Sequence, residues 1–208
     1  MSRRRIAVGL ACLALAALAR HWLEAAMLRH MLLQVPLLLA AGWMLAGGAA
    51  RSTAPAAIAR CDQHGVCGLT VLLFVTAYWM IPRALEQSIT APGAEAAKFA
   101  SLLALGAIMP GSLRRANSIV QLFFLGNFSW MMAVAGIQYQ SMQQRLCNAY
   151  LLDDQAWTGV GLVAASVAIA AIWCWRLAPA FINHSNKAHH VPTSAEPRID
   201  RHAGPRVL

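Results

Sequence analysis

The chain has 208 residues, of which 59% are apolar and 12% charged, and its formal net charge is +9. A soluble domain carries about 25% charged residues, and a disordered chain has low hydrophobicity, so the composition excludes both classes. Five cysteines in a chain of this length do not indicate a disulfide scaffold. The composition therefore predicts a polytopic membrane protein that is surrounded by the lipid bilayer.

Six apolar runs are candidates for membrane-spanning helices, each of which needs about 20 mostly apolar residues. They cover residues 6–19, 31–50, 67–81, 97–109, 118–137 and 157–175. The third and fourth runs are short and must borrow flanking residues such as Lys98, whose aliphatic stem can snorkel. No run alternates as a transmembrane β-strand does. We therefore expect an all-α membrane protein, a polytopic bundle of about six transmembrane helices.

The two ends of the chain are expected to differ from this bundle. Three arginines at positions 3–5 precede an apolar run that ends in Ala17-Leu18-Ala19, which is the pattern of a signal peptide. An uncleaved first helix fits the same residues, so segment 1–19 is an anchor or a signal peptide, and cleavage would leave five spans. Residues 20–177 form the expected bundle. Residues 178–208, which contain four histidines, are expected to form a disordered basic tail.

The distribution of charge predicts the orientation. Twelve of the 17 basic residues and three of the eight acidic residues fall in segments 1–5, 51–66, 110–117 and 176–208. The positive-inside rule places these segments in the cytoplasm. We therefore expect a multi-pass membrane protein with a cytoplasmic C-terminus. Because the basic charge is explained by orientation, no nucleic-acid partner is expected.

Polar residues at the edge of the membrane are the default functional candidates. If the segment from residue 20 to 34 is one helix, spacings of three and four align Glu24, Met27, His30, Met31 and Gln34 on one stripe. Thioether ligands select Cu(I), and imidazole accepts copper in either oxidation state. The alternative is a packed methionine stripe with His30 at the interface.

Other segments contribute further candidates. Met80 is expected at the same depth as His30, close to Pro82, which stops or kinks the third span. Asp154 lies at the start of the last span, where it is a candidate for an entry charge or for a helix-capping residue. The trio Cys61, His64 and Cys67 has the spacing of soft metal ligands. Its predicted cytoplasmic position favours free thiols, with transient metal handling as the alternative.

Three segments together carry a family resemblance. Residues 26–36, AMLRHMLLQVP, keep His30 and Pro36 of a His-Met-x-x-His run that continues into an apolar stretch. Residues 79–82, WMIP, are similar to a Trp-His-x-Pro run, and residues 154–159, DQAWTG, to Asp-Gln-Gln-x-x-Gly. These motifs resemble those of the CtaG-type cytochrome c oxidase assembly factors. Ala26 and Met80 replace histidines of that pattern, and the chain is shorter than typical members.

The resemblance implies an integral-membrane assembly factor for a respiratory haem–copper oxidase, located in a bacterial inner membrane and with an oxidase subunit as partner. His30, Met27 and Met80 are the expected Cu(I) ligands, with Glu24 and Asp154 as supporting or entry charges. The alternative is an accessory subunit of a respiratory complex without metal. A channel or transporter ranks third, because no paired broken helices occur in corresponding halves. No glycine-rich phosphate loop, Gly-x-Ser-x-Gly or His-Glu-x-x-His motif occurs in the sequence, so no enzyme is expected.

Overall fold

The structure, a computed structural model, describes residues 3–46 and 62–189, with side chains as far as residue 176. Within these residues all regular structure is helical, which confirms the all-α fold class. In chain order the elements are α1 (Arg3–Leu18), α2 (Arg20–Glu24), α3 (Met27–Arg29), the π-helix η1 (His30–Gln34), α4 (Val35–Ala46), α6 (Val66–Trp79), α7 (Pro82–Thr90), α8 (Pro92–Arg115), α9 (Ser118–Ser141) and α10 (Leu152–His189).

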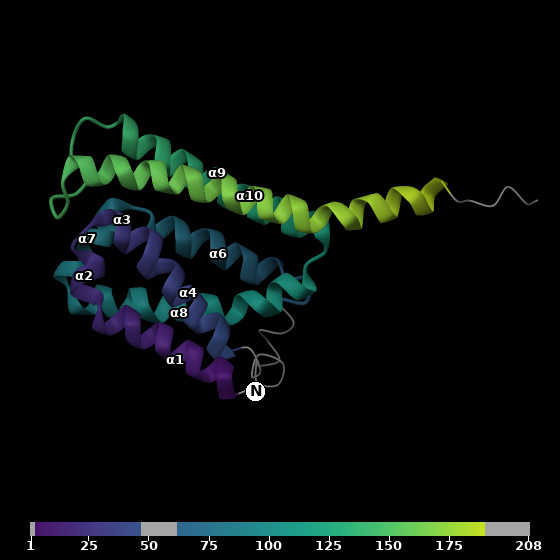
Figure 1. The fold of residues 1–208 in the computed structure, drawn as a ribbon, viewed down its shortest axis with the longest axis horizontal. Coiled ribbons are helices and arrows are strands. Elements are labelled where there is room, and N and C mark those ends of the chain that lie inside the picture. The colour runs from purple at the N-terminus through teal and green to yellow at the C-terminus, as the bar shows by residue number, and fades with distance from the viewer. Residues whose placement is uncertain (1–2, 47–61, 190–208) are drawn as a thin grey trace, which may run out of the picture.

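The long helices run up and down along one common axis (Figure 1). Helix α4 packs against α1 and α8, and α6 packs against α8 and α9. Helices α9 and α10 form an antiparallel hairpin that lies along one side of the other helices (Figure 1). We call the end of the bundle with α2, α7 and the loop 142–151 the loop end, and the end with Arg3, Asp62 and Arg115 the arginine end.

The expected number of about six spans is not confirmed. Among the described residues, four helical segments are long and apolar enough to cross a membrane: Met27–Ala46, Pro92–Arg115, Ser118–Ser141 and Leu152–Arg176. Helices α6 and α7 add a fifth if they make one span, although they are bent by 74°. Helix α1 has 16 residues, starts with three arginines and is about 24 Å long, which is less than the roughly 30 Å of a bilayer core.

Two prolines explain the bend between α6 and α7 and the start of α8. Pro82 is the first residue of α7, where a missing N–H costs nothing, and the preceding Ile81 is extended. Pro92 begins α8 in the same way after the extended Ala91. The helix formed by the third apolar run therefore ends at Trp79, two residues before the expected end at residue 81.

The last helix is longer than the sequence predicts. Helix α10 continues to His189, so the segment that follows residue 177 begins as helix, whereas a disordered tail was expected from residue 178. Residues 190–208, the remainder of that expected tail, lie outside the described residues.

Glycines let two pairs of helices approach closely. A Cβ at Gly42 would overlap the carbonyl oxygen of Leu103, and one at Gly106 would overlap that of Leu39. In the hairpin, a Cβ at Gly136 would lie 2.6 Å from the carbonyl oxygen of Gly159. Small residues at helix contacts are the usual means of tight packing in membranes, because they bring backbones together.

At the arginine end, Asp62 fastens α6 to α8. Its carboxylate accepts hydrogen bonds from the Gly68 backbone N–H (3.0 Å) and from the Ser112 hydroxyl (2.7 Å), and it forms an ion pair with Arg115. Burial by itself raises the pKa of Asp62, but these hydrogen bonds and the Arg115 charge outweigh it and hold the pKa below its usual value. Gly65, with φ of +75°, makes the turn that leads into α6.

Candidate functional site

The loop end contains a buried polar cluster centred on Lys98 of α8. The side chain of Lys98 has no solvent exposure. Its Nζ donates to Glu24 Oε1 (2.7 Å) and to Gln34 Oε1 (3.0 Å), and lies 2.8 Å from His30 Nε2. Tyr150 completes the group, because its hydroxyl is 2.8 Å from His30 Nδ1. These five residues, which we call the Lys98 cluster, join α2, η1, α8 and the loop 142–151.

The hydrogen-bond network assigns the state of His30. An ammonium group has only donors, so Nε2 of His30 must accept from Lys98. The ring proton of a neutral imidazole then resides on Nδ1, which donates to the Tyr150 oxygen. Burial raises the pKa of the Tyr150 hydroxyl, which keeps this residue neutral. The cluster therefore contains one positive charge on Lys98 and one negative charge on Glu24.

Local backbone geometry turns His30 toward this cluster. The segment from residue 20 to 34 is not one continuous helix, because Ala26 is extended and separates α2 from α3. The following turn, His30–Gln34, is a π-helix in which the Val35 N–H donates to the His30 carbonyl. Pro36 has no N–H to offer the Leu32 carbonyl, so the regular α-helical pattern is interrupted at this point. π-turns of this kind are frequent at functional sites.

Asp154 has a structural partner on a segment far from it in sequence. Its carboxylate accepts hydrogen bonds from the backbone N–H groups of Met27 and Leu28, the latter at 3.5 Å. These are donors at the start of a helix, which has no acceptors of its own for them. Asp154 therefore caps α3 from the first turn of α10, rather than capping its own helix.

Further hydrogen bonds at the loop end connect the loop 142–151, α9, α10 and the end of α6. Gln155 accepts from the Leu146 N–H (2.9 Å) and donates to the Tyr139 carbonyl (3.1 Å), and the Tyr139 hydroxyl donates to the Met80 carbonyl. Cys147 is buried in this loop, and burial raises the pKa of its thiol, so it is a poor source of the thiolate that binds metals.

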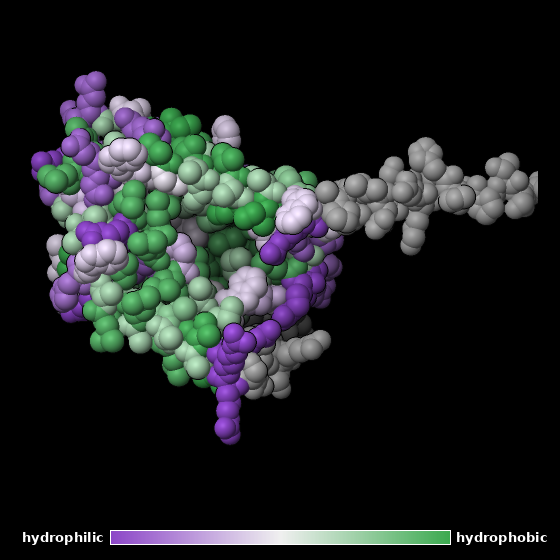
Figure 2. Space-filling model, in the orientation of Figure 1, coloured by the Kyte–Doolittle hydropathy of each residue, from purple (hydrophilic) through white to green (hydrophobic). Residues whose placement is uncertain are grey.

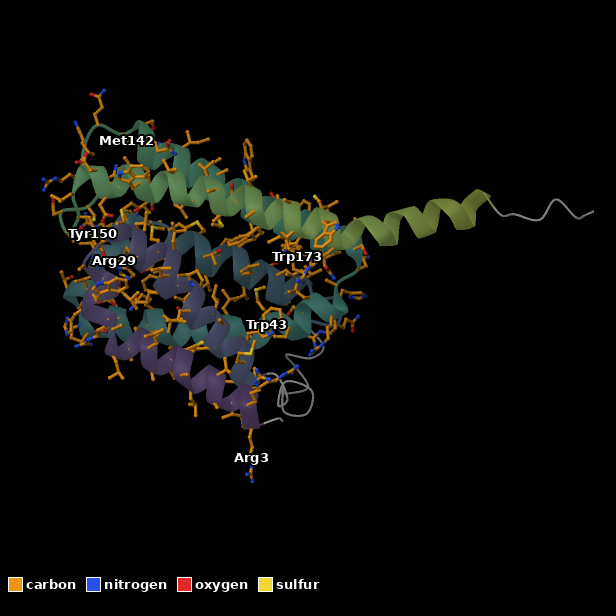
Figure 3. All side chains as sticks on the ribbon, in the orientation of Figure 1. Arg3, Arg29, Trp43, Met142, Tyr150 and Trp173 are labelled. Carbon is orange, nitrogen blue, oxygen red and sulfur yellow. The ribbon has the colours of Figure 1, made fainter. Side chains whose placement is uncertain are left out.

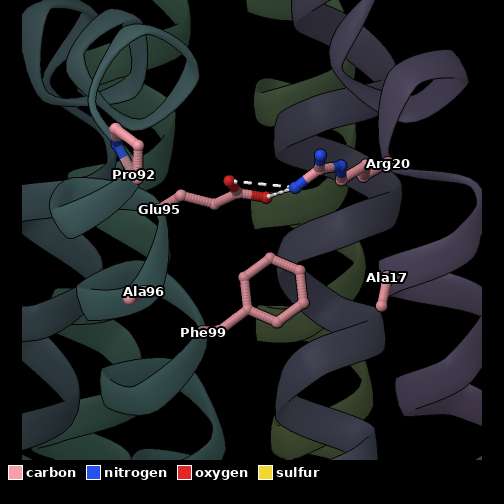
Figure 4. A pocket seen from close by; sticks show the side chains of 6 residues that line it. All are labelled: Ala17, Arg20, Pro92, Glu95, Ala96 and Phe99. Carbon is pink, nitrogen blue, oxygen red and sulfur yellow. Dashed lines mark hydrogen bonds and ion pairs between the residues drawn. The ribbon is translucent and has the colours of Figure 1, made fainter.

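An ion pair lies at the rim of the same end. Arg20 of α2 donates to both carboxylate oxygens of Glu95 on α8, at 2.9 and 3.1 Å, beside the Phe99 ring (Figure 4). The side chains of Arg20 and Glu95 are 44% and 25% exposed, so this pair is hydrated, unlike Lys98 and Glu24.

The five expected copper-site residues all lie at the loop end, but they do not form one ligand set. Met27 is buried and Met80 is half-buried, and both pack in one apolar cluster with Met31 and Met132. His30 has hydrogen-bond partners on both ring nitrogens, Glu24 pairs with Lys98, and Asp154 caps α3. The part of the chain that the structure describes brings no three His, Cys, Asp or Glu side chains together as a metal-holding group.

The structure describes only two residues of the trio Cys61, His64 and Cys67 at the arginine end. Cys61 lies outside the described residues, whereas His64 and Cys67 are exposed at the start of α6. Among the described residues Cys67 forms no disulfide, and the state of the trio as a whole stays a prediction.

Sequence reasoning missed Lys98 as the centre of the cluster. It was expected to snorkel toward water, but its amine points into the bundle because Glu24, His30 and Gln34 offer three acceptors there. A signal was present: Lys98 is the one basic residue within the fourth apolar run, and Glu24 is an acid near the same end of the neighbouring span.

Comparison of this chain with protein-family models, with characterised proteins and with solved structures finds no match in any of the three.

Proposed function

We propose that this chain is an integral-membrane assembly or accessory factor for a respiratory haem–copper oxidase, not an enzyme, in a bacterial inner membrane with its C-terminus in the cytoplasm. The oxidase as partner rests on the resemblance of three short segments to CtaG-type factors. One observation supports treating these segments as a unit. Asp154 of the third segment binds the backbone of the first, and Met80 of the second packs against the apolar cluster that contains Met27 of the first.

The interactions that hold the helices together at the loop end support this function. Hydrogen bonds and an ion pair join α2, α3, η1, α8 and α10 at the loop end, so the surface formed there is rigid. A rigid surface at a membrane edge suits recognition of a partner subunit, because little conformational entropy is lost on binding. The polar groups of the Lys98 cluster hold the helices together, and the surrounding surface contacts the partner subunit.

A resident copper ion at His30 does not fit this arrangement. The Lys98 ammonium lies 2.8 Å from Nε2, where a metal would bind, and its positive charge repels a cation. Tyr150 occupies the other ring nitrogen. Both ring nitrogens of His30 are therefore occupied by protein partners.

A specific observation favours copper handling as a second candidate function. Met31, Met80 and Met132 line one cavity, and Met27 packs in the same cluster. Thioether sulfur is a soft ligand that selects Cu(I). In this second candidate the methionines hold Cu(I) weakly for transfer to the oxidase, while His30 remains hydrogen-bonded.

A deletion experiment tests the partner. Loss of the gene should lower the amount of assembled haem–copper oxidase, measured from reduced-minus-oxidised haem spectra of membranes and from oxygen consumption. The wild-type gene should restore both. A Glu95→Gln variant, which changes only the hydrated rim pair, should also restore them. Unchanged oxidase in the deletion strain would refute the proposal.

Copper analysis of the purified protein under reducing conditions separates the two candidates. The accessory function predicts no stoichiometric copper in the wild type. Copper handling predicts bound Cu(I) that is retained by His30→Ala, lost on Met80→Leu and unaffected by Met44→Leu, which changes a methionine toward the arginine end. Copper that is lost in His30→Ala but kept in Met80→Leu would contradict both.

A further inference from the structure

Two apolar cavities adjoin each other along one face of η1 and α4. The first, about 250 Å³, lies between this face and the helices α6, α9 and α10. The second, about 260 Å³, lies between the same face and α8. They share Leu39, and Figure 2 shows a hydrophobic hollow between the hairpin and the helices beneath it. We call the two cavities together the furrow.

The face of η1 and α4 that lines the furrow has the spacing of a single helical stripe. It consists of Met31, Leu32, Val35, Pro36, Leu39, Ala40, Trp43 and Met44, at steps of one and three. From Leu32 to Met44 the stripe is about 18 Å long at about 1.5 Å per residue. One leaflet of the hydrocarbon core is about 15 Å thick. The furrow therefore has the length of one acyl chain.

The lining of the furrow is too apolar to hold ordered water. Apart from the indole N–H groups of Trp43 and Trp79, Thr76 has the one polar side-chain group among the residues that line it. Its hydroxyl already donates to the Leu72 carbonyl at 2.5 Å. A stable buried water needs two to four polar partners, and apolar cavities remain dry. In a bilayer, the available apolar filling is a hydrocarbon chain.

The volume argues against a helix of a partner protein. A helix about 10 Å in diameter and 18 Å long occupies roughly 1,400 Å³. The furrow offers about 500 Å³ in total. A single narrow chain fits, whereas a helix could only lie on top.

The arginine end supplies charge for a lipid headgroup. Trp43 and Trp173 lie toward this end (Figure 3). On α10, Ile169 lines the furrow, Trp173 follows one turn later, and the exposed Arg176 lies 5.7 Å from the Trp173 ring centre. Arg114, at the end of α8, is also exposed. Tryptophan and arginine at this level are typical of the membrane interface, and arginine binds phosphate through its planar donors.

We propose that the furrow binds an acyl chain of an anionic phospholipid whose phosphate lies near Arg176 and Arg114. The lipid fills the gap between the hairpin α9–α10 and the other helices. This proposal does not depend on the oxidase partner. The acyl chain occupies the cavity that Met31, Met80 and Met132 line, so it is an alternative to copper at these methionines.

The test is photolabelling of the full-length protein in nanodiscs that contain phosphatidylglycerol with a diazirine in its acyl chain, followed by mapping of the adducts by mass spectrometry. Adducts should concentrate on Leu39, Trp43 and Ile169. They should be several-fold fewer on Phe123 and Trp130, whose side chains are exposed on α9 outside the furrow. Equal labelling of both groups would overturn the proposal.

Matched variants sharpen the result. Ala165→Phe and Ala40→Phe add a ring inside the furrow and should remove most furrow adducts, whereas Val167→Phe, at an exposed position of α10 outside the furrow, should not. Retained adducts in both filling variants would refute the site. The two filling variants are independent of each other, so if one of them misfolds, the other still tests the site.

The headgroup is tested by a phosphatidylcholine probe with the same chain. It should label the furrow several-fold less than the phosphatidylglycerol probe, and Arg176→Gln should reduce this difference. Equal labelling by the two probes would overturn the anionic assignment. Recovery of an isoprenoid quinone or a bound second protein from the furrow would overturn the lipid itself.

Discussion

Replacement of Lys98 by methionine is the strongest perturbation of the loop end that the structure predicts. The change keeps the side-chain volume similar but leaves the Glu24 carboxylate, His30 Nε2 and Gln34 Oε1 without their shared donor. Breaking a buried ion pair from one side costs about 3–5 kcal/mol, because it leaves a buried charge uncompensated. Since the Lys98 side chain is 0% and Glu24 10% exposed, solvent provides little relief. We expect a loss of about 3–5 kcal/mol in the free energy of unfolding.

The double variant distinguishes a charge effect from a packing effect. Glu24→Gln alone should also destabilise, because it leaves the Lys98 ammonium without a counter-charge. Lys98→Met combined with Glu24→Gln removes both charges and should recover more than half of the loss, since apolar or neutral replacements of a buried pair are often tolerated. The two single effects are therefore expected to be strongly non-additive.

The measurement is reversible unfolding in mixed micelles, followed by far-ultraviolet circular dichroism. Arg20→Gln is the matched control, because it breaks the hydrated pair with Glu95 and should cost no more than about 1 kcal/mol. If Lys98→Met is as stable as Arg20→Gln, or if the double variant is as unstable as the sum of the single ones, the buried-pair reasoning is refuted.

Three further predictions concern packing, acid stability and orientation. Gly106→Leu should destabilise the fold by about 1–3 kcal/mol in the same assay, because any Cβ there overlaps a carbonyl oxygen of α4. Gly126→Ala, which meets open space inside α9, should not destabilise it and is expected to stabilise it by about 0.5–1 kcal/mol. Asp62 has a lowered pKa, so its contribution is present above its unfolded pKa of about 3.9 and is lost as the pH falls through the lower folded value. Asp62→Asn should therefore be less stable at pH 7 and lose less stability than wild type on acidification below about pH 4, and parallel pH curves would contradict this. Thiol labelling of intact cells with an impermeant reagent should modify Asn148→Cys but spare Cys67, and the reverse pattern would invert the expected orientation.

The loop-end cysteine shows why such labelling needs an introduced residue. From sequence, Cys147 is an outer-loop residue that an external reagent should reach. In the structure its side chain is buried with Tyr139 and Tyr150, so its reaction should be slow in the folded protein. Position in a loop is visible in sequence, whereas burial depends on how the loop folds back on the helices.

The sequence by itself determined the helical class and the asymmetry of charge. These features depend on local composition: long apolar runs can satisfy their backbone groups in a membrane only as helices, and arginines such as Arg114 and Arg176 cluster at one end of successive runs. The sequence also located Glu24, His30 and Asp154 near one membrane edge. It could not determine their partners.

Only the tertiary structure decided what these residues contact. Lys98 and Glu24 are separated by 74 positions, and Asp154 and Met27 by 127, so no local pattern joins them. The break at Ala26 changes the alignment of the stripe from Glu24 to Gln34 that one continuous helix would give. Lys98 occupies the ring nitrogen of His30 that a metal would need. Hydrophobicity specifies which segments become helices but not which side chains are buried, since Lys98 is buried while Phe123 and Trp130 are exposed. The pairing of buried polar groups is decided by the relative rotation and height of packed helices, because each hydrogen bond depends on distances of a few tenths of an ångström.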